Sequence, residues 1–249
     1  MMTVGIIGLG KLGNAIYNAI KDRFDTIGTD GEHNIGVAKT SDIVILAVKP
    51  NIIPDVANEI AAHIRDATII VSVAAGVTIG RLENLFDAKK TIVRAMPNTP
   101  LLVGEGMTAI CANKNAKKRQ INHVTRIFKY MGKCEIIGEE QMDIITAISG
   151  SSPAYTYMYI EAMVNAAVKL GMPPHTAALF AGQAVLGSAK MVLESGRPPE
   201  LLINDVCSPG GTTIEAVKVL EQTHFADCVK QAVNAAYEKS IKIGKQADI

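Results

Sequence analysis

A short glycine pattern near the N-terminus constrains the fold more than any other feature of this sequence. The run "TVGIIG" at residues 3 to 8 is apolar and leads into "GLGKLG", which gives Gly8, Gly10 and Gly13 the spacing G-x-G-x-x-G. In such a motif the first glycine makes a tight turn, the second lets the backbone approach a pyrophosphate, and the third lets a helix pack closely on the strand. Because residues 11 to 22 follow with helical periodicity, the motif predicts a dinucleotide-binding strand, turn and helix rather than an ordinary glycine turn.

Two patterns divide the chain near residue 150. In the first part, short apolar runs alternate with amphipathic stretches. We expect strands at residues 42 to 50, 67 to 76 and 90 to 98, and a helix at residues 53 to 64 between the first two of these strands. Nearly continuous apolar strands are typical of a parallel sheet that is covered on both faces. The order strand, helix, strand predicts an α/β fold with an open, doubly wound, mostly parallel sheet over residues 1–150.

The second part, residues 151–249, has the pattern of an all-helical domain. Alanine-rich stretches with helical spacing predict helices at residues 152 to 171, 173 to 195, 213 to 222 and 224 to 244. Gly171 is expected to end the first of these helices and Pro173 to begin the second. Apolar residues occupy several faces of these helices, and one small domain cannot cover so much apolar surface. This pattern predicts a homodimer formed through the helices.

Composition excludes several classes of protein. The chain has 25 Lys and Arg against 24 Asp and Glu, a balance that gives no reason to expect nucleic acid as a partner. The N-terminal apolar run is too short to span a bilayer and has no basic segment before it, so we expect a cytoplasmic protein that does not bind membranes. Four cysteines lack C-x-x-C pairing and five histidines lack ligand spacing, which predicts reduced thiols and no metal site.

One acidic residue is a candidate for selecting the cofactor. Asp30 ends the run "DTIGTD", where a carboxylate would hydrogen-bond the adenosine ribose and favour NAD over NADP by repelling a 2′-phosphate. A turn-forming Asp before Gly31 is nearly as well supported. Only about a dozen residues separate Asp30 from the strand at Ile43, too few for a full crossover helix.

Further candidates follow the next strands. Lys49 and Pro50 end the run "LAVKP" at the sheet edge where ligands bind, so Lys49 is expected to contact a cofactor phosphate or to be a solvated strand-end lysine. Asn98 lies between two prolines in "AMPNTP", and its carboxamide is predicted to meet the nicotinamide, with a turn-forming Asn as the alternative.

Two clusters of charged residues are expected to have structural roles. A basic cluster is expected on the solvated face of a single helix, and it consists of Lys114, Lys117, Lys118 and Arg119. Glu139 and Glu140 are expected to precede a helix and to stabilise its N-terminus electrostatically, with a position lining the site as the alternative.

A second glycine-rich segment, "CSPGGTTIEAV", begins at Cys207. Adjacent glycines let the backbone approach a ligand, and a helix start offers unpaired N–H groups to an anion. A phosphate already has a predicted site at residues 8 to 13, nearly 200 residues earlier, so this helix start is free for a smaller anion.

Several segments in order, "GIIGLGKLG", "LAVKP", "VSVAAGVTI", "RAMPNTP", "SGSSPAY" and "SPGGTT", resemble the pyrroline-5-carboxylate reductase family through nearly the whole chain. The segment "SPGGTT" is the most specific, because the others are partly shared with β-hydroxyacid-dehydrogenase-like proteins. The resemblance implies a Rossmann-like domain followed by a helical dimerisation domain like the C-terminal domain of 6-phosphogluconate dehydrogenase. It also implies reduction of 1-pyrroline-5-carboxylate to L-proline with NADPH or NADH, and dimers that assemble into larger rings.

The resemblance also implies roles for residues. It assigns the cofactor to Gly8, Leu9, Gly10, Lys11, Leu12, Gly13, Ala47, Val48, Lys49, Pro50, Val73, Ala74, Ala75 and Asn98, in addition to Asp30. It assigns the substrate to Val206, Ser208, Gly210, Gly211, Thr212 and Thr213. A protonated cyclic imine needs mainly positioning and exclusion of water to accept hydride. Thr213 is the candidate catalytic residue at the ring nitrogen, and Ser208 is expected to assist at the carboxylate; a simple helix cap is the alternative for Thr213.

The chain departs from the family pattern at several positions. The segment after Asp30 is shorter than usual, Ser152 replaces a common glycine, Asn204 a common aspartate and Cys207 a common threonine. Two other functions are therefore kept as alternatives. One is a β-hydroxyacid dehydrogenase, which would need a helical-domain lysine such as Lys169 or Lys190 as acid and base. The other is an inactive dinucleotide-sensing or scaffold protein.

Overall fold

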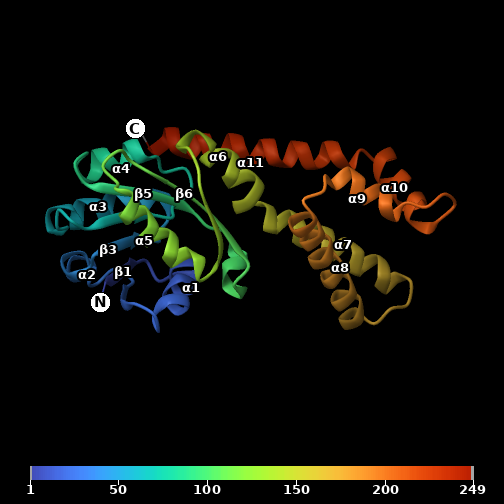
Figure 1. The fold of residues 1–249 in the computed structure, drawn as a ribbon, viewed down its shortest axis with the longest axis horizontal. Helices are drawn as coiled ribbons and strands as arrows, with labels where there is room; N and C mark the ends of the chain where they lie inside the picture. Colours follow the sequence, from blue (N-terminus) through green and yellow to red (C-terminus); the bar gives the residue numbers. More distant parts are fainter. Residues whose placement is uncertain (1, 248–249) are drawn as a thin grey trace. The chain divides into compact units, whose positions relative to one another are not determined.

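A computed structural model describes residues 2–247. The first part of the chain forms a seven-stranded sheet (Figure 1). The strands lie in the order β2-β1-β3-β4-β5-β6-β7. All neighbouring pairs are parallel except β5 with β6, which confirms the doubly wound, mostly parallel sheet. The bounds are β1 Thr3–Ile7, β2 Asp25–Thr29, β3 Ile43–Leu46, β4 Ile69–Ser72, β5 Thr91–Met96, β6 Gly106–Ala112 and β7 Gly132–Ile136.

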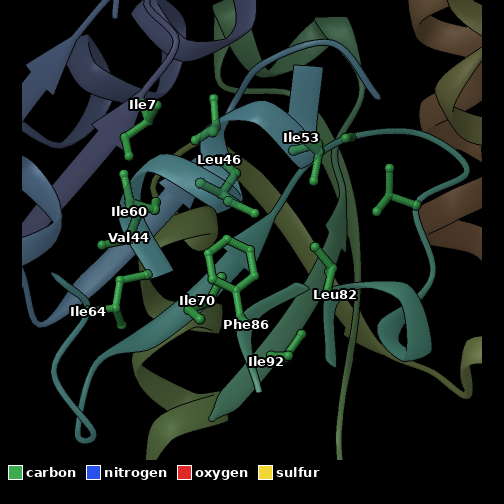
Figure 2. Close-up of a cluster of buried hydrophobic side chains, with 14 of the residues drawn as sticks. Ile7, Val44, Leu46, Ile53, Ile60, Ile64, Ile70, Leu82, Phe86 and Ile92 are labelled. Carbon is green, nitrogen blue, oxygen red and sulfur yellow. The ribbon is translucent and has the colours of Figure 1, made fainter. Parts of the chain in front are cut away.

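Helices cover both faces of this sheet because successive strand residues point to opposite faces. In β3, Ile43 and Ile45 pack into one core together with α1 (Lys11–Ile20) and α5 (Lys118–Lys129). Val44 and Leu46 pack into the other core, together with the helices α2 Asn34–Thr40, α3 Ile53–Ile60 and α4 Ile79–Phe86. Figure 2 shows this second core, in which the ring of Phe86 lies among aliphatic side chains. The strands are buried on both faces, as their continuous apolar sequences predict.

In the first part of the chain, the predicted elements are longer than those observed. The strands expected at 42 to 50, 67 to 76 and 90 to 98 are β3, β4 and β5, and the residues beyond their ends form loops at the sheet edge. The helix expected at 53 to 64 ends at Ile60 and continues as a short 3-10 turn, Ala61–His63. The short connection after Asp30, residues 31–42, contains a helix of only seven residues, α2, as the chain length requires.

The basic cluster is corrected by the structure, whereas the acidic pair precedes a helix as predicted. Helix α5 begins at Lys118, and Lys114 precedes it in a turn in which Ala116 N–H donates to the Asn113 carbonyl at 3.1 Å, so the four basic residues do not share one helix. Glu139 and Glu140 lie in a 3-10 turn (Glu139–Gln141) before α6 (Met142–Ile145), and the Glu139 carboxylate also accepts a hydrogen bond from Ile79 N–H at the start of α4.

The second part of the chain is helical, as predicted. Its helices are α7 Ser152–Lys169, α8 Pro174–Ser195, α9 Pro199–Val206, α10 Thr212–Gln222 and α11 Phe225–Ala247, of which α9 was not predicted. Gly171 adopts φ +99° after α7, and Met172 N–H donates to the Ala167 carbonyl at 3.0 Å, which completes a Schellman motif. By length and composition, α8 is the one helix among residues 2–247 that could cross a bilayer.

The chain forms two compact units. The first consists of Met1–Pro153 and Asn234–Ile249, and the second of Ala154–Val233. Helix α11 therefore starts in the second unit and ends in the first. This return of the chain is a feature that a simple division into residues 1–150 and 151–249 leaves out.

Candidate functional site

Four loops meet along the edge of the sheet at the carboxyl ends of its parallel strands. Backbone hydrogen bonds join them in sequence: Gly8 N–H donates to the Thr29 carbonyl at 2.9 Å, Ala47 N–H to Ile7 at 2.8 Å, and Val73 N–H to Leu46 at 3.2 Å. The residues predicted to bind the dinucleotide after β1, β2, β3 and β4 therefore lie at one edge. Ligands of open α/β sheets bind outside this edge.

The glycines of the motif each meet the requirement that the spacing predicts. Gly8 adopts φ +98°, and a Cβ there would lie 2.7 Å from Val48 Cγ1. A Cβ at Gly13 would lie 1.8 Å from the Gly8 carbonyl oxygen, so only glycine lets α1 pack this close. Gly10, the N-cap of α1, faces open space and no side chain caps the helix. The free N–H groups at the start of α1 and the gap at Gly10 fit a pyrophosphate.

Asp30 lies beside this glycine loop. Its Oδ1 accepts a hydrogen bond from Leu9 N–H at 3.3 Å, and the side chain is exposed. Its Oδ2 has no hydrogen-bond partner among residues 2–247. The carboxylate is thus fixed next to the pyrophosphate cradle with one oxygen left to accept a further hydrogen bond. This placement favours the cofactor-binding interpretation of Asp30 over that of a turn residue alone.

The loops after β3 and β4 offer different groups to a ligand. Lys49 is exposed and makes no ion pair among the described residues, and it caps a 3-10 turn, Pro50–Ile52, without a side-chain hydrogen bond. Val73 and Ala74 are each only 5% exposed because their side chains belong to the two cores. A ligand contact from these two residues would therefore come from the backbone.

Asn98 holds two segments of the chain together. Its Oδ1 accepts a hydrogen bond from Met107 N–H at 2.9 Å, and its Nδ2 donates to the carbonyl and the hydroxyl of Ser149, each at 3.3 Å. Ser149 lies in a π-helical turn, Thr146–Gly150, of a kind that is frequent at functional sites. A contact between Asn98 and the nicotinamide stays a prediction, while its structural role is that of a brace.

In the second unit, the loop between α9 and α10 forms an open helix start. Gly210 adopts φ +72°, and Gly211 is the N-cap of α10 with no side-chain cap. Thr212 and Thr213 occupy the first two helical positions, so their N–H groups have no intrahelical acceptor. Val206 is exposed at the end of α9.

The two hydroxyls of this loop are held differently. A Cβ at Gly211 would lie 2.6 Å from Ser208 Oγ, so the Ser208 hydroxyl lies against the helix start. Thr213 is not the N-cap, and its half-buried hydroxyl has no hydrogen-bond partner among residues 2–247. The interpretation of Thr213 as a helix cap is therefore wrong, and its hydroxyl is free to meet a ligand.

A buried ion cluster, which the sequence did not reveal, lies on the far side of the β4 loop. Arg94 of β5 is only 2% exposed, and its Nη1 is 3.4 Å from Glu139 Oε1 and its Nη2 3.7 Å from Asp143 Oδ1. Burial in this region, with the negative charge of Glu139, raises the pKa of the Cys111 thiol to about 12. Arg94 and its acidic partners are 45 or more residues apart, so no local pattern links them.

A doubly wound sheet with an open glycine cradle at its edge, followed by a helical unit, defines a Rossmann-type dinucleotide-binding protein. Two family models match the chain: "Pyrroline-5-carboxylate reductase dimerisation" over residues 139–243 and "NADP oxidoreductase coenzyme F420-dependent" over residues 18–76.

Individual relatives give the same answer over nearly the full length. Pyrroline-5-carboxylate reductase of Escherichia coli is 41% identical, over 97% of this chain and 98% of the relative. Human pyrroline-5-carboxylate reductase 2 is 35% identical, over 99% and 85%. The crystal structure of Plasmodium falciparum pyrroline carboxylate reductase with NADP bound superposes with a TM-score of 0.90 and 35% identity, over 98% of each chain. The chain belongs to the pyrroline-5-carboxylate reductase family.

Proposed function

We propose that this protein reduces 1-pyrroline-5-carboxylate to L-proline by hydride transfer from NADPH or NADH, the last step of proline biosynthesis. The observation that carries the proposal is the open α10 start, a glycine-and-hydroxyl anion site in a chain that already has a separate dinucleotide cradle. Membership of the reductase family and the NADP-bound relative support the same reaction.

In this proposal, the N–H groups at the start of α1 bind the pyrophosphate, and Asp30 accepts a hydrogen bond from the adenosine ribose. The remaining contacts come from the loops after β3, β4 and β5. When bound, the dinucleotide supplies the hydride. The residues of the chain supply orientation and exclude water.

The substrate carboxylate binds the N–H groups of Gly210 to Thr213, with Ser208 as an additional donor. The Thr213 hydroxyl orients the protonated ring nitrogen of the imine and hydrogen-bonds the amine that forms when hydride adds to the neighbouring carbon. No base with an unusual pKa is needed, because the protonated imine is already electrophilic.

The surface of the second unit supports a homodimer. Helices α7, α10 and α11 surround a groove of about 730 Å³ whose lining includes Tyr159, Met163, Val219, Leu220, Phe225 and Val229. Contiguous exposed apolar faces mark interaction surfaces, and the dimerisation model covers these helices. A second copy of the chain is the proposed partner. Rings of dimers, a cytoplasmic location and the absence of membrane binding complete the proposal; α8 would then be covered by protein rather than lipid.

The alternative of a β-hydroxyacid dehydrogenase needs a lysine as acid and base. Lys190 instead pairs with Glu194 one turn along the exposed face of α8, at 3.6 Å. Lys169 is exposed at the end of α7. Neither lysine lies in the glycine-rich loops, so the reductase is the better supported function.

The central experiment follows NADPH and NADH absorbance separately in the presence of 1-pyrroline-5-carboxylate. We expect the wild-type chain to oxidise at least one cofactor, and we expect Thr213→Ala to lower kcat/KM by roughly 10²-fold, as for loss of a group that positions the reacting atoms. Thr223→Ala is the matched control, because Thr223 follows the other end of α10 and its hydroxyl bonds only to helix carbonyls. No turnover by the wild type would exclude the reductase, and equal rates for both variants would remove the role of Thr213.

We further propose that NADH is preferred over NADPH. Besides the Asp30 charge, the N–H groups of Gly31 and His33 already donate to Thr29 Oγ1, at 3.3 and 3.2 Å, so they are not free for a 2′-phosphate. Asp30→Ser should shift the kcat/KM ratio towards NADPH by about tenfold, which is ~1.4 kcal/mol. Asp25→Ser, at the other end of β2, removes the same charge and should leave the ratio unchanged. An unaltered ratio in Asp30→Ser would return Asp30 to the role of a turn residue.

A further inference from the structure

The buried Arg94 cluster is poorly explained as a device for stability alone. Removing a guanidinium from water is costly unless it is fully paired. Yet both of its carboxylate partners lie at 3.4 Å or more, and Nη2 has no hydrogen-bond partner among residues 2–247. The two carboxylates keep about a third of their surface exposed. The carboxylates therefore do more than neutralise Arg94.

Each carboxylate holds a different segment of the first unit. Glu139 Oε1 accepts a hydrogen bond of 2.6 Å from Ile79 N–H, the first residue of α4. Asp143 Oδ1 accepts a hydrogen bond of 2.6 Å from the hydroxyl of Ser240, a buried residue of α11. One guanidinium thus orients two acids that fix the start of α4 and the end of α11.

Residues 73–78, the loop between β4 and α4, lie between these fixed points. Gly76 adopts φ +76°, and a Cβ there would lie 2.7 Å from Ile243 Cγ2 and 3.1 Å from the Ser240 carbonyl oxygen. A Cβ at Gly244 would lie 3.0 Å from the Gly76 carbonyl oxygen. Helix α11 therefore touches the backbone of the loop directly, with no side chain of Gly76 or Gly244 between them. The same loop begins with Val73, Ala74 and Ala75, the proposed cofactor contacts.

We propose that Arg94 is a positioning residue that acts through Glu139 and Asp143: it clamps the β4 loop between α4 and α11 and so sets the affinity for the dinucleotide. The inference rests on the proposed function only in that the loop contacts the cofactor. Since Val73 and Ala74 offer only backbone groups, their position depends on what holds the loop from behind. The clamp fixes the backbone of Val73 and Ala74, whose buried side chains cannot contact the cofactor.

The test measures dinucleotide binding without substrate, by the fluorescence of NADH during titration of the full-length protein. Ser240→Ala and Asp143→Asn should each raise the Kd for NADH roughly three- to thirtyfold, as expected for coupling through a packed network. The KM for 1-pyrroline-5-carboxylate should stay within about twofold, which a general loss of structure would not allow. The double variant should weaken binding no more than the stronger single variant, because both act through one contact.

Asp66→Asn is the matched control, because the exposed Asp66 pairs at 2.7 Å with Lys90, which lies at the opposite end of β5. Its Kd for NADH should equal that of the wild type. The Kd for NADH of Arg94→Met is interpreted only if this variant unfolds cooperatively on heating. If it does not, the Kd of Ser240→Ala decides whether the clamp exists. Wild-type Kd values in Ser240→Ala and Asp143→Asn would overturn the clamp, as would equal losses for NADH and for the imine. Failure of the wild type to bind either NADH or NADPH would instead overturn the proposed function and this inference with it.

Discussion

The two compact units bury their apolar side chains in opposite ways. In the first unit, two continuous cores on either side of the sheet contain aliphatic residues with no exposed surface, such as Leu46, Ile70 and Leu82 (Figure 2). In the second unit, the only buried hydrophobic residues among those described are Ala177 and Ala181. Most of its large apolar residues are exposed.

This difference indicates where each unit obtains its stability. A sheet covered by helices on both faces forms its core from a single chain. Helices that are apolar on several faces gain their hydrophobic free energy only when another surface covers them. We therefore expect the stability of the first unit to be independent of protein concentration, and that of the second to depend on the partner copy.

The largest expected effect comes from placing a charge on the apolar surface of the second unit. Phe180 of α8 is 66% exposed in the single chain. Phe180→Asp should weaken the dimer by about 2 kcal/mol or more, at least thirtyfold in Kd, because burial of the aspartate would be unpaired. Sedimentation over a dilution series measures this change.

Ile136→Asp is the control for that experiment, since Ile136 is 55% exposed on β7 in the first unit. It should leave the dimer Kd unaltered. If the wild type is monomeric at micromolar concentration, or if both variants dissociate equally, the contrast between the units is wrong.

An effect of comparable size, on the folding of one chain rather than on the dimer, is expected in the core of the first unit. Leu82 of α4 has no exposed surface, so Leu82→Ala should lower the free energy of unfolding by about 2–5 kcal/mol. Leu102→Ala, at a residue 65% exposed, should cost less than about 0.5 kcal/mol. Urea unfolding at two protein concentrations tests both. A first-unit transition that shifts with concentration would contradict an independent core.

The smallest expected effect is a pH dependence at the other edge of the sheet. The Thr3 backbone N–H, together with Arg65, holds the pKa of Asp42 below its ordinary value of 3.8. A lowered folded-state pKa contributes stability that is present above pH 3.8 and is lost as the pH falls through the folded-state value. Asp42→Asn should therefore lower the free energy of unfolding at pH 7 by a few tenths of a kcal/mol, seen as a slightly lower melting temperature, and by less at pH 3. Equal losses at both pH values would exclude the charge as the cause.

The sequence predicted those features that depend on neighbouring residues. The glycine spacing identified the turn at Gly8, the open position at Gly10 and the close helix contact at Gly13, and each has the predicted geometry. Continuous apolar runs identified β3, β4 and β5, and helical periodicity identified α7 and α8. These signals are local because backbone conformation and burial of one face repeat over a few residues.

Features that depend on distant pairing were missed. Strand β7 has only five residues and α9 only eight, too few for a clear period. The Asn98 brace and the Arg94 cluster each join residues more than 40 positions apart. Such contacts follow from the tertiary fold, so a single sequence gives no sign of them.

The division of α11 between the units has a consequence for synthesis on the ribosome. Domains generally fold as the chain emerges, N-terminal first. Here Ser240 and Gly244, which pack behind the β4 loop, are made about 90 residues after the last strand-and-helix segment of the first unit. The helices of the second unit emerge in between, so the dinucleotide-binding unit is completed only after them. Nascent chains can therefore expose the surfaces for pairing with a second copy before the cofactor cradle has its final form.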